Sequence, residues 1–256
     1  MSNLNVCVAG ATGWTGSAIA EAVAAAADLE LRSAVSRSAA GGEIHGAPVH
    51  AGVAEALDGV DVMVDYTSHD VAKPNALAAI ERGVAVVIGT SGLTADDFEE
   101  IGAAARERGV GVIAAGNFSL TAAMTKAAAQ LAARYLPSWE IIDYASAGKA
   151  DAPNGTAREL AEALGESARE RSPADTHGAV EARGADIAGT QVHSLRLPSF
   201  TVSTEVVFAL PDERLSIRHD AGSSAAPYVA GTLLAVRAAP GRVGLTRGLD
   251  ALLAEI

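Results

Sequence analysis

The stretch Asn5-Val-Cys-Val-Ala9-Gly10-Ala-Thr-Gly13-Trp-Thr-Gly16 decides the fold of this chain. Its first five residues are mostly apolar and predict a buried strand, and the segment from Ser17 to Ala27 has the pattern of a helix. A glycine-rich turn between a strand and a helix lets a pyrophosphate reach the free N–H groups at the helix N-terminus. The spacing G-x-x-G-x-x-G is a variant of the commoner G-x-G-x-x-G. We therefore expect a dinucleotide site, with a tight turn that binds no ligand as the alternative.

Strands and helices continue to alternate after this turn. Strands are predicted at 29–35, 60–64, 85–88 and 111–114, and helices at 71–82 and 95–108. Repeated β–α units imply an α/β fold with a parallel sheet, whose ligands lie outside the carboxyl ends of the strands. The residues that follow these strand ends are the predicted cofactor contacts: Gly10, Thr12, Gly13, Trp14, Thr15, Gly16, Ser36, Arg37, Tyr66, Thr67, Gly89, Thr90, Ser91, Gly116, Asn117 and Phe118.

The residues after the second strand, Ser36-Arg37-Ser38, bear on the choice of cofactor. An acidic residue at this place binds the ribose of NAD, whereas an arginine accommodates the extra phosphate of NADP. A guanidinium flanked by two hydroxyls suits a phosphate, so we expect NADPH. Because exposed arginines are common, a solvated Arg37 is the alternative, and NADH stays open.

The C-terminal half has a different pattern. We expect a helix over 120–136, a strand over 140–145, a helix over 157–169, a long loop over 171–190, antiparallel strands over 191–196, 201–209 and 213–219, and a final helix over 225–237. Clustered strands after a series of β–α units predict a second, α+β domain. An open sheet there would expose an apolar face that other subunits can cover.

The stretch Lys149-Ala-Asp-Ala-Pro-Asn154-Gly155-Thr156 predicts an anion site. Pro-Asn-Gly is a turn signal, and the spacing of Thr156 and Glu159 is that of a capping box, so we expect a helix from Ala157. The free N–H groups of a helix start attract anions, and Lys149 adds a positive charge. We expect a small carboxylate here; an ordinary helix start beside a solvated lysine is the alternative.

Composition limits the partners. Of 256 residues, 49% are hydrophobic, which is a globular composition large enough to bury a core. A formal charge of -12 argues against nucleic acid, which needs clustered basic residues. The single cysteine, Cys7, lies in an apolar strand and is expected to be a buried, inert thiol. We expect a cytoplasmic protein, because neither a leader nor a membrane-length apolar run is evident, and we expect no metal, because no ligand spacing is present.

With these motifs in hand, the chain resembles the dihydrodipicolinate reductase family. The most specific element of the resemblance is the run from Lys149 to Ala157, which has the form K-x-D-A-P-[SN]-G-T-A. The other matching segments are Val8–Gly13, Asp65–Thr67, Gly89–Gly92, Gly116–Ser119, Arg183–Asp186, Val192–Arg196, Ile217–Asp220 and Gly231–Arg237. Together they cover nearly the whole chain, in register with the cofactor motifs.

The resemblance implies a Rossmann-type dinucleotide-binding domain of residues 1–119 and 222–256. It implies a substrate domain of residues 120–221, whose open mixed sheet builds a homotetramer. The reaction it implies is hydride transfer from NADH or NADPH to a small cyclic, imine-conjugated dicarboxylate. We expect Lys149 to be catalytic. Substrate contacts are expected from Ser91, Ser146, Asn154, Gly155 and Thr156.

Four positions depart from the family pattern. The family's H-H-x-H-K run is Ala145-Ser146-Ala-Gly-Lys149 here, so the position of the general acid is an alanine that carries no proton. A later histidine position is Ser203, and an arginine position is Ser224. Each lost charge-assisted hydrogen bond removes about 1.5–3 kcal/mol of binding free energy.

Several functions therefore stay open. One is a reductase of the lysine-pathway substrate with Lys149 or water as the proton donor, because general acid catalysis contributes only about 10²–10⁴-fold. Another is a paralogue that reduces a different C=N or C=C compound. A third is a non-catalytic NADP-binding sensor, which the intact Lys149–Thr156 run disfavours. A short-chain dehydrogenase is set aside, because Tyr144 and Lys149 are five residues apart and not four.

Overall fold

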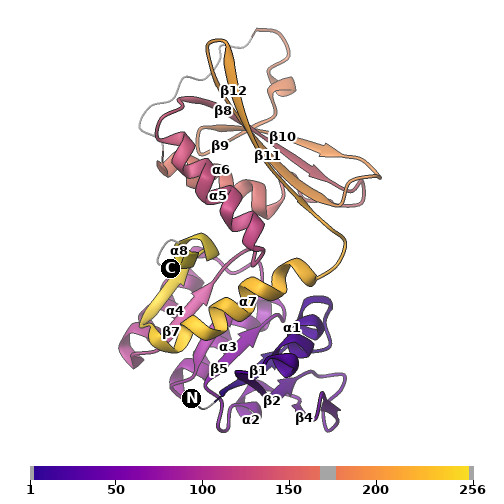
Figure 1. Cartoon of the computed structure of the whole chain (residues 1–256), viewed down its shortest axis with the longest axis vertical. Coiled ribbons are helices and arrows are strands. Elements are labelled where there is room, and N and C mark those ends of the chain that lie inside the picture. The colour runs from indigo at the N-terminus through magenta and orange to yellow at the C-terminus, as the bar shows by residue number, and fades with distance from the viewer. Residues whose placement is uncertain (1–2, 168–176, 254–256) are drawn as a thin grey trace. The chain divides into compact units, whose positions relative to one another are not determined.

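The computed structural model describes residues 3–167 and 177–253, which belong to two compact units (Figure 1). Unit 1 comprises Met1–Leu120 and Ala225–Ile256, and unit 2 comprises Thr121–Ser224. Two sequence predictions fall partly outside the described residues: the end of the helix expected to reach Arg169 and the start of the loop expected over 171–190. Among the described residues, no helix is both long and apolar enough to span a bilayer.

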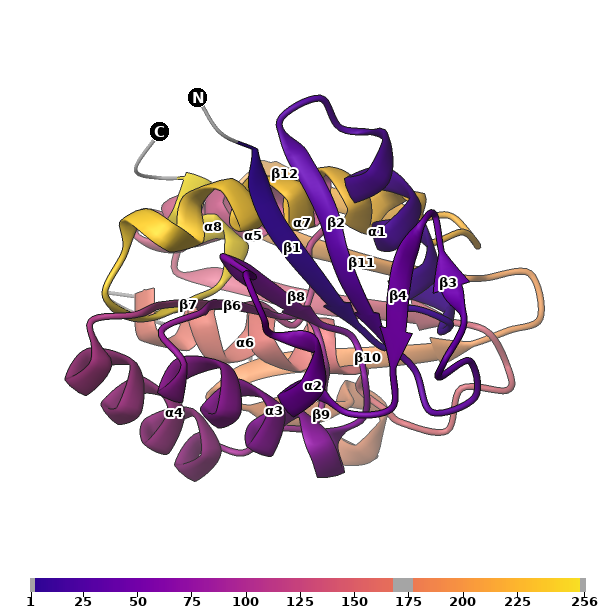
Figure 2. The same cartoon turned by 90° about the horizontal axis from the view of Figure 1, so that it is seen from below.

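Unit 1 is built on an eight-stranded sheet with the order β13-β7-β6-β5-β1-β2-β4-β3. The strands are β1 (Leu4–Ala9), β2 (Leu29–Val35), β3 (Glu43–Ile44), β4 (Ala47–His50), β5 (Val62–Asp65), β6 (Ala85–Ile88), β7 (Gly111–Ala114) and β13 (Gly244–Arg247). All pairs are parallel except β3 with β4. The arrowheads of β1, β2 and β4 therefore point to one edge (Figure 2). Because β1 pairs with β2 on one side and β5 on the other, the strand order reverses at β1, where such sheets bind ligands.

Helices cover both faces of this sheet, as expected for a Rossmann-type fold. The helices are α1 (Trp14–Ala25), α2 (Val53–Ala56), α3 (His69–Glu81), α4 (Ala95–Arg108), α7 (Ala226–Ala238) and α8 (Leu249–Leu253). In Figure 2, α3 and α4 lie on one face, whereas α1, α7 and α8 lie on the other. The α/β class predicted from the alternating pattern is thus confirmed.

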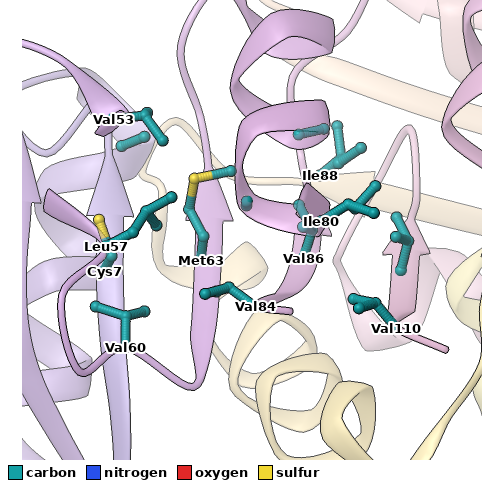
Figure 3. Close-up of a cluster of buried hydrophobic side chains, with 14 of the residues drawn as sticks. Cys7, Val53, Leu57, Val60, Met63, Ile80, Val84, Val86, Ile88 and Val110 are labelled. Carbon is teal, nitrogen blue, oxygen red and sulfur yellow. The ribbon is translucent and has the colours of Figure 1, made fainter. Parts of the chain in front are cut away.

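The core on the α3–α4 face is made of aliphatic side chains from the strands and helices (Figure 3). Met63 and Val86 from adjacent strands are fully buried and pack with Ile80 of α3. Cys7 is buried in the same cluster, and burial raises the pKa of its thiol to about 11. The predicted burial of Cys7 is confirmed, and a raised pKa favours the protonated thiol, which is the less reactive form.

Unit 2 is a five-stranded mixed sheet with the order β12-β11-β8-β10-β9. Its strands are β8 (Ser138–Ala145), β9 (Ala185–Ile187), β10 (Thr190–Arg196), β11 (Val202–Leu210) and β12 (Glu213–Ala221). The helices are α5 (Leu120–Ala133) and α6 (Gly155–Ser167), and a short 3-10 turn spans Val180–Arg183. The prediction that 191–196 is an antiparallel strand is wrong for its main pairing, because β10 runs parallel to β8. Helix α6 lies between them in the chain, and such a crossover connection joins parallel strands.

One face of the unit 2 sheet packs against α5 and α6. Trp139 and Ile141 of β8 and Phe208 of β11 are buried with Leu160 and Leu164 of α6. Strand β8 alternates between buried and half-buried residues along its length, which is the period of a strand with one covered face. At the carboxyl end of this strand the chain turns into the Lys149 stretch.

Candidate active site

The glycine turn after β1 leaves no room for a side chain at Gly10 or Gly16. Gly10 has a φ of +82°, and a Cβ there would lie 2.3 Å from the carbonyl oxygen of Tyr66. A Cβ on Gly16 would lie 2.1 Å from the carbonyl oxygen of Gly10. Helix α1 begins at Trp14, inside the glycine turn, and Gly13 at its N-cap offers no side chain to the first N–H groups. The turn therefore fits a pyrophosphate, because backbone donors can be approached closely and are not capped.

Hydroxyl groups line the end of β2. Thr12 and Ser36 hydroxyls are 2.7 Å apart, and the Ser36 and Ser38 hydroxyls are 3.2 Å apart. Arg37 is exposed between the two serines, and an exposed guanidinium is accessible to a phosphate. Trp14, which is 60% exposed, lies edge-on to Tyr228 of α7 with ring centroids 6.0 Å apart.

Asp65 organises the loops after β5 and β6. Its buried carboxylate accepts hydrogen bonds from the Thr67 backbone N–H at 2.9 Å and the Thr67 hydroxyl at 2.6 Å. It also accepts from the Thr90 hydroxyl at 2.7 Å and from the Asn75 amide at 2.8 Å. The sequence predictions for Thr67 and Thr90 thus fall on two residues that the structure brings together.

The side chains of Tyr66 and Phe118 pack against each other instead of presenting polar groups to a ligand. The Tyr66 hydroxyl lies 2.7 Å from the Thr232 hydroxyl of α7, and burial raises the pKa of this phenol. The two rings meet edge-on at 6.2 Å. A Cβ on Gly89 would lie 2.2 Å from the Tyr66 ring, so this glycine is required for the close approach. The Tyr66 N–H donates to the carbonyl oxygen of Ala9 and Phe118 is buried, whereas Gly116 is exposed and its backbone is accessible to a ligand.

The start of α6 differs from the sequence prediction. The helix begins at Gly155, and its cap is Asn154, whose Oδ1 accepts the Ala157 N–H at 2.9 Å. The predicted capping box of Thr156 and Glu159 is therefore wrong, and Glu159 instead pairs with Lys126 of α5 at 2.9 Å. Among the described residues, no acceptor meets the N–H groups of Gly155 and Thr156. They are the two free donors at this helix start.

A buried ion pair holds this helix start in place. Asp143 of β8 is fully buried and accepts the backbone and side-chain N–H groups of Asn154. Arg196 of β10 donates to the Asp143 carboxylate at 2.7 Å and to the carbonyl oxygen of Asp151 at 2.6 Å. Ser194 adds a fourth hydrogen bond to Asp143 at 3.0 Å. The turn that carries Gly155 is thus fixed to two strands of the sheet.

Lys149 lies in the loop before this turn. Its Nζ is 3.0 Å from the Asp151 carboxylate, and its backbone N–H donates to the carbonyl oxygen of Ser146. The hydrogen bond from Lys149 lowers the pKa of Asp151. Because about one third of the Lys149 side chain is exposed, the ammonium is accessible to a ligand. Lys149, Gly155 and Thr156 are called the carboxylate clamp below.

Comparisons with known proteins identify the family. The family model "Dihydrodipicolinate reductase, N-terminus" matches residues 4–118, and "Dihydrodipicolinate reductase, C-terminus" matches residues 118–253. The chain belongs to the dihydrodipicolinate reductase family. It is therefore a nicotinamide-dependent oxidoreductase, as the sequence motifs predict.

Relatives within the family match over nearly their full length. The 4-hydroxy-tetrahydrodipicolinate reductase of Nocardia farcinica is 39% identical, with 96% of this chain and 97% of the relative covered. That of Moorella thermoacetica is 38% identical, with 99% of both chains covered. A dipicolinate-bound dihydrodipicolinate reductase from Paenisporosarcina sp. TG-14 superposes with a TM-score of 0.85 at 25% identity, covering 97% of this chain and 98% of that one.

The positions that depart from the family pattern have different surroundings. Ala145 is fully buried on β8, and Ser203 is buried on β11. A hydrogen bond from Ser203, second to that from Arg218, lowers the pKa of Asp220. Ser224 is exposed, and Ser146 is half-buried with its N–H bonded to the carbonyl oxygen of Thr201. None of these four side chains supplies the charge that the family pattern has there.

Asp65, Asp143 and Arg196 hold the loops of the candidate site in place, and the predicted site residues did not include them. A signal for the first two was present, since Asp65 ends an otherwise apolar strand and Asp143 falls at an inward-facing position of the alternating strand β8. A carboxylate at such a place must meet several donors. Which donors it meets could not be predicted, because Thr90 and Arg196 come from distant segments.

Proposed function

We propose that the protein reduces 4-hydroxy-tetrahydrodipicolinate with a nicotinamide cofactor. The observation that carries the proposal is the carboxylate clamp: the partly exposed Lys149 ammonium lies in the loop before α6, and among the described residues no acceptor meets the Gly155 and Thr156 N–H groups that begin this helix. The buried pair of Asp143 and Arg196 fixes that turn before any ligand arrives. Preorganised donors of this kind bind an anion without the free-energy cost of ordering a loop.

Two features of unit 1 fit a dinucleotide cofactor: the glycine turn after β1 and Arg37. Side chains at Gly10 and Gly16 would collide with backbone carbonyl oxygens, so glycine is needed at both positions to form this turn. Exposed Arg37 beside the hydroxyls of Ser36 and Thr12 offers a site for the 2′-phosphate, and we propose NADPH as the preferred cofactor, with NADH as the second. When bound, the reduced nicotinamide supplies the hydride.

The chain's own residues then bind and neutralise the substrate. The clamp holds one carboxylate and thereby limits the orientations of the substrate ring. The proton that completes the reduction comes from Lys149 or from water, because Ala145 has no titratable group. Ser91, Ser146 and Asn154 complete our proposed set of substrate contacts, Asn154 through its cap on α6.

A second candidate substrate is a cyclic imine or unsaturated acid with a single carboxylate. The observation that favours a monocarboxylate is the small number of accessible cations beside the carboxylate clamp. Arg196 turns its guanidinium to Asp143 and to the carbonyl oxygen of Asp151, which leaves Lys149 as the accessible cation of the loop. A site with one accessible cation holds a monocarboxylate better than a dicarboxylate.

We also propose a cytoplasmic homotetramer. The face of the unit 2 sheet away from α5 and α6 carries Ile142 and Tyr144 of β8, both half-buried, and Leu195 of β10, which is 37% exposed. Packing against other copies of the chain would cover this face.

The test is an assay of purified protein with freshly generated 4-hydroxy-tetrahydrodipicolinate, following the loss of NADPH or NADH absorbance. Turnover on the order of 1–10³ per second supports the proposal. Nucleotide binding without turnover would exclude this substrate and lead to a screen of cyclic imines and unsaturated monocarboxylates. An Arg37→Ala variant should lose the preference for NADPH over NADH; an unchanged preference would exclude Arg37 as the phosphate ligand.

A further inference from the structure

Asp65 is a fully buried carboxylate whose hydrogen-bond partners are neutral. Its Oδ1 accepts from the Thr67 N–H and from the hydroxyls of Thr67 and Thr90, and its Oδ2 accepts from Asn75. Within the described part of the chain, no ion pair to Asp65 is present. A buried carboxylate that is satisfied only by neutral donors polarises each of them.

The two hydroxyls have a fixed direction as a result. A hydroxyl has one hydrogen to donate, and Thr67 and Thr90 each donate theirs to the Asp65 carboxylate, at 2.6 and 2.7 Å. The Asp65 carbonyl oxygen is a second, longer acceptor for Thr90 at 3.2 Å. The remaining lone pairs of each oxygen can only accept. Both oxygens bond to the same atom of Asp65, so the two acceptors lie on either side of one carboxylate oxygen. Both residues are half-buried and not fully enclosed.

The strand order indicates which part of a dinucleotide would lie here. Arg37 and Ser36 follow β2 on one side of β1, where the adenosine phosphate is expected. The other nucleotide then lies on the opposite side, over the ends of β5 and β6, where Thr67 and Thr90 are found. The nicotinamide half carries a strong donor in its carboxamide N–H₂ group. A phosphate or carboxylate, which only accepts, would face two acceptors backed by a negative charge.

We infer that Asp65 is a positioning residue that holds Thr67 and Thr90 as paired acceptors for the carboxamide N–H₂ of the nicotinamide ring. The inference rests on the proposed nicotinamide cofactor and extends it to the group that orients the ring. Asp65 does not touch the cofactor; it acts through the two threonines.

The test compares the binding of NADP⁺ with that of its 3-acetylpyridine analogue, which replaces the carboxamide N–H₂ by a methyl group. Dissociation constants are measured by titration calorimetry. The wild type should bind NADP⁺ about tenfold more tightly, as expected for one or two neutral hydrogen bonds. Thr67→Val and Thr90→Val should each lower this preference to about threefold, and Asp65→Asn should lower it as well, because the threonines lose their fixed direction.

The ratio of the dissociation constants for NADP⁺ and its analogue distinguishes a positioning role of Asp65 from a merely structural one. A variant that only loosens unit 1 weakens both nucleotides equally and leaves the ratio unchanged. Thr67→Ser and Thr90→Ser retain the hydroxyl oxygen and should keep the preference for NADP⁺ over the analogue. These two variants keep the inference testable if a valine variant fails to fold. Thr94→Val is the matched control, because the Thr94 hydroxyl also donates to an aspartate, Asp97 at 2.8 Å, but at the start of α4.

Equal binding of the two nucleotides by the wild type, or an unchanged ratio in the valine and Asp65→Asn variants, would overturn the inference and leave the proposed function intact. Binding of neither nucleotide would overturn both. The readout needs no substrate, so it does not depend on which compound the enzyme reduces.

Discussion

Replacing Arg196 by methionine should destabilise unit 2 and impair the carboxylate clamp together. The substitution keeps most of the apolar stem of Arg196 and removes the charge that pairs with the fully buried Asp143. Breaking a buried ion pair by removing one partner costs about 3–5 kcal/mol. Three donors from Asn154 and Ser194 still bond to Asp143, so we expect a loss near the lower end, about 3 kcal/mol.

The two tryptophans make this loss measurable in unit 2 alone. Trp139 is 4% exposed in the core of unit 2, whereas Trp14 is 60% exposed in unit 1. Unfolding in urea will therefore shift the emission of Trp139 and change that of Trp14 little. With an m-value of about 1.5 kcal/mol per M, the midpoint of the Trp139 transition should fall by about 2 M. Exposed Arg214 on β12 provides the control, and Arg214→Met should change the stability by less than about 0.5 kcal/mol.

The same variant should raise the substrate KM, because the turn that carries Gly155 loses its tie to β10. NADPH binding, which depends on unit 1, should not change. A loss of stability below about 1 kcal/mol would refute the reasoning that Arg196 neutralises a buried Asp143. A normal stability with a raised KM would mean that Arg196 contacts the substrate itself.

Three further predictions concern other parts of the chain. Lys149→Ala should lower kcat/KM by about 10–150-fold, as expected for the loss of one charge-assisted hydrogen bond. The NADPH dissociation constant should stay the same. A change confined to NADPH binding would contradict the assignment of Lys149 to the substrate. Gly89→Ala should cost about 1–3 kcal/mol in thermal unfolding, because its Cβ would lie 2.2 Å from the Tyr66 ring, and adding Tyr66→Val should restore part of the loss. Hydrogen bonds from Thr94, then from Lys73, lower the pKa of Asp97 from 3.8 to about 2, so its contribution to stability is present above pH 3.8 and is lost as the pH falls toward 2. Asp97→Asn should flatten the stability profile in that window, and an unchanged acid limb would show that Asp97 does not contribute.

Much of unit 1 could be predicted from the sequence, because the signals that mark its strands and helices are local and strong. β2, β6, β7 and α4 have the predicted bounds. α4 has a capping box at Thr94 and a left-handed Gly109 at its end, which are the signals that define a helix. The elements that were missed, β3, β4, β9, β13, α2 and α8, are two to five residues long. Segments of that length have too few residues to show a period.

Errors at the site arose where a distant partner decides the local structure. Asn154, and not Thr156, caps α6, because Asp143 from β8 holds its backbone and its side-chain amide. The spacing of Thr156 and Glu159 fits a capping box, but Lys126 of α5 takes the glutamate. The hydroxyl directions of Thr67 and Thr90 likewise depend on where the Asp65 carboxylate lies. Such contacts link segments far apart in the chain and leave no local pattern.

The central claim is that this chain transfers hydride from a nicotinamide to a small unsaturated carboxylate. The most direct test supplies NADPH stereospecifically deuterated at C4 of the nicotinamide, on each face in turn, together with 4-hydroxy-tetrahydrodipicolinate, and measures the mass of the product. The account predicts that one of the two labelled cofactors yields a product one mass unit heavier and that the other yields an unlabelled product. Oxidation of both cofactors with no deuterium in the product would contradict it.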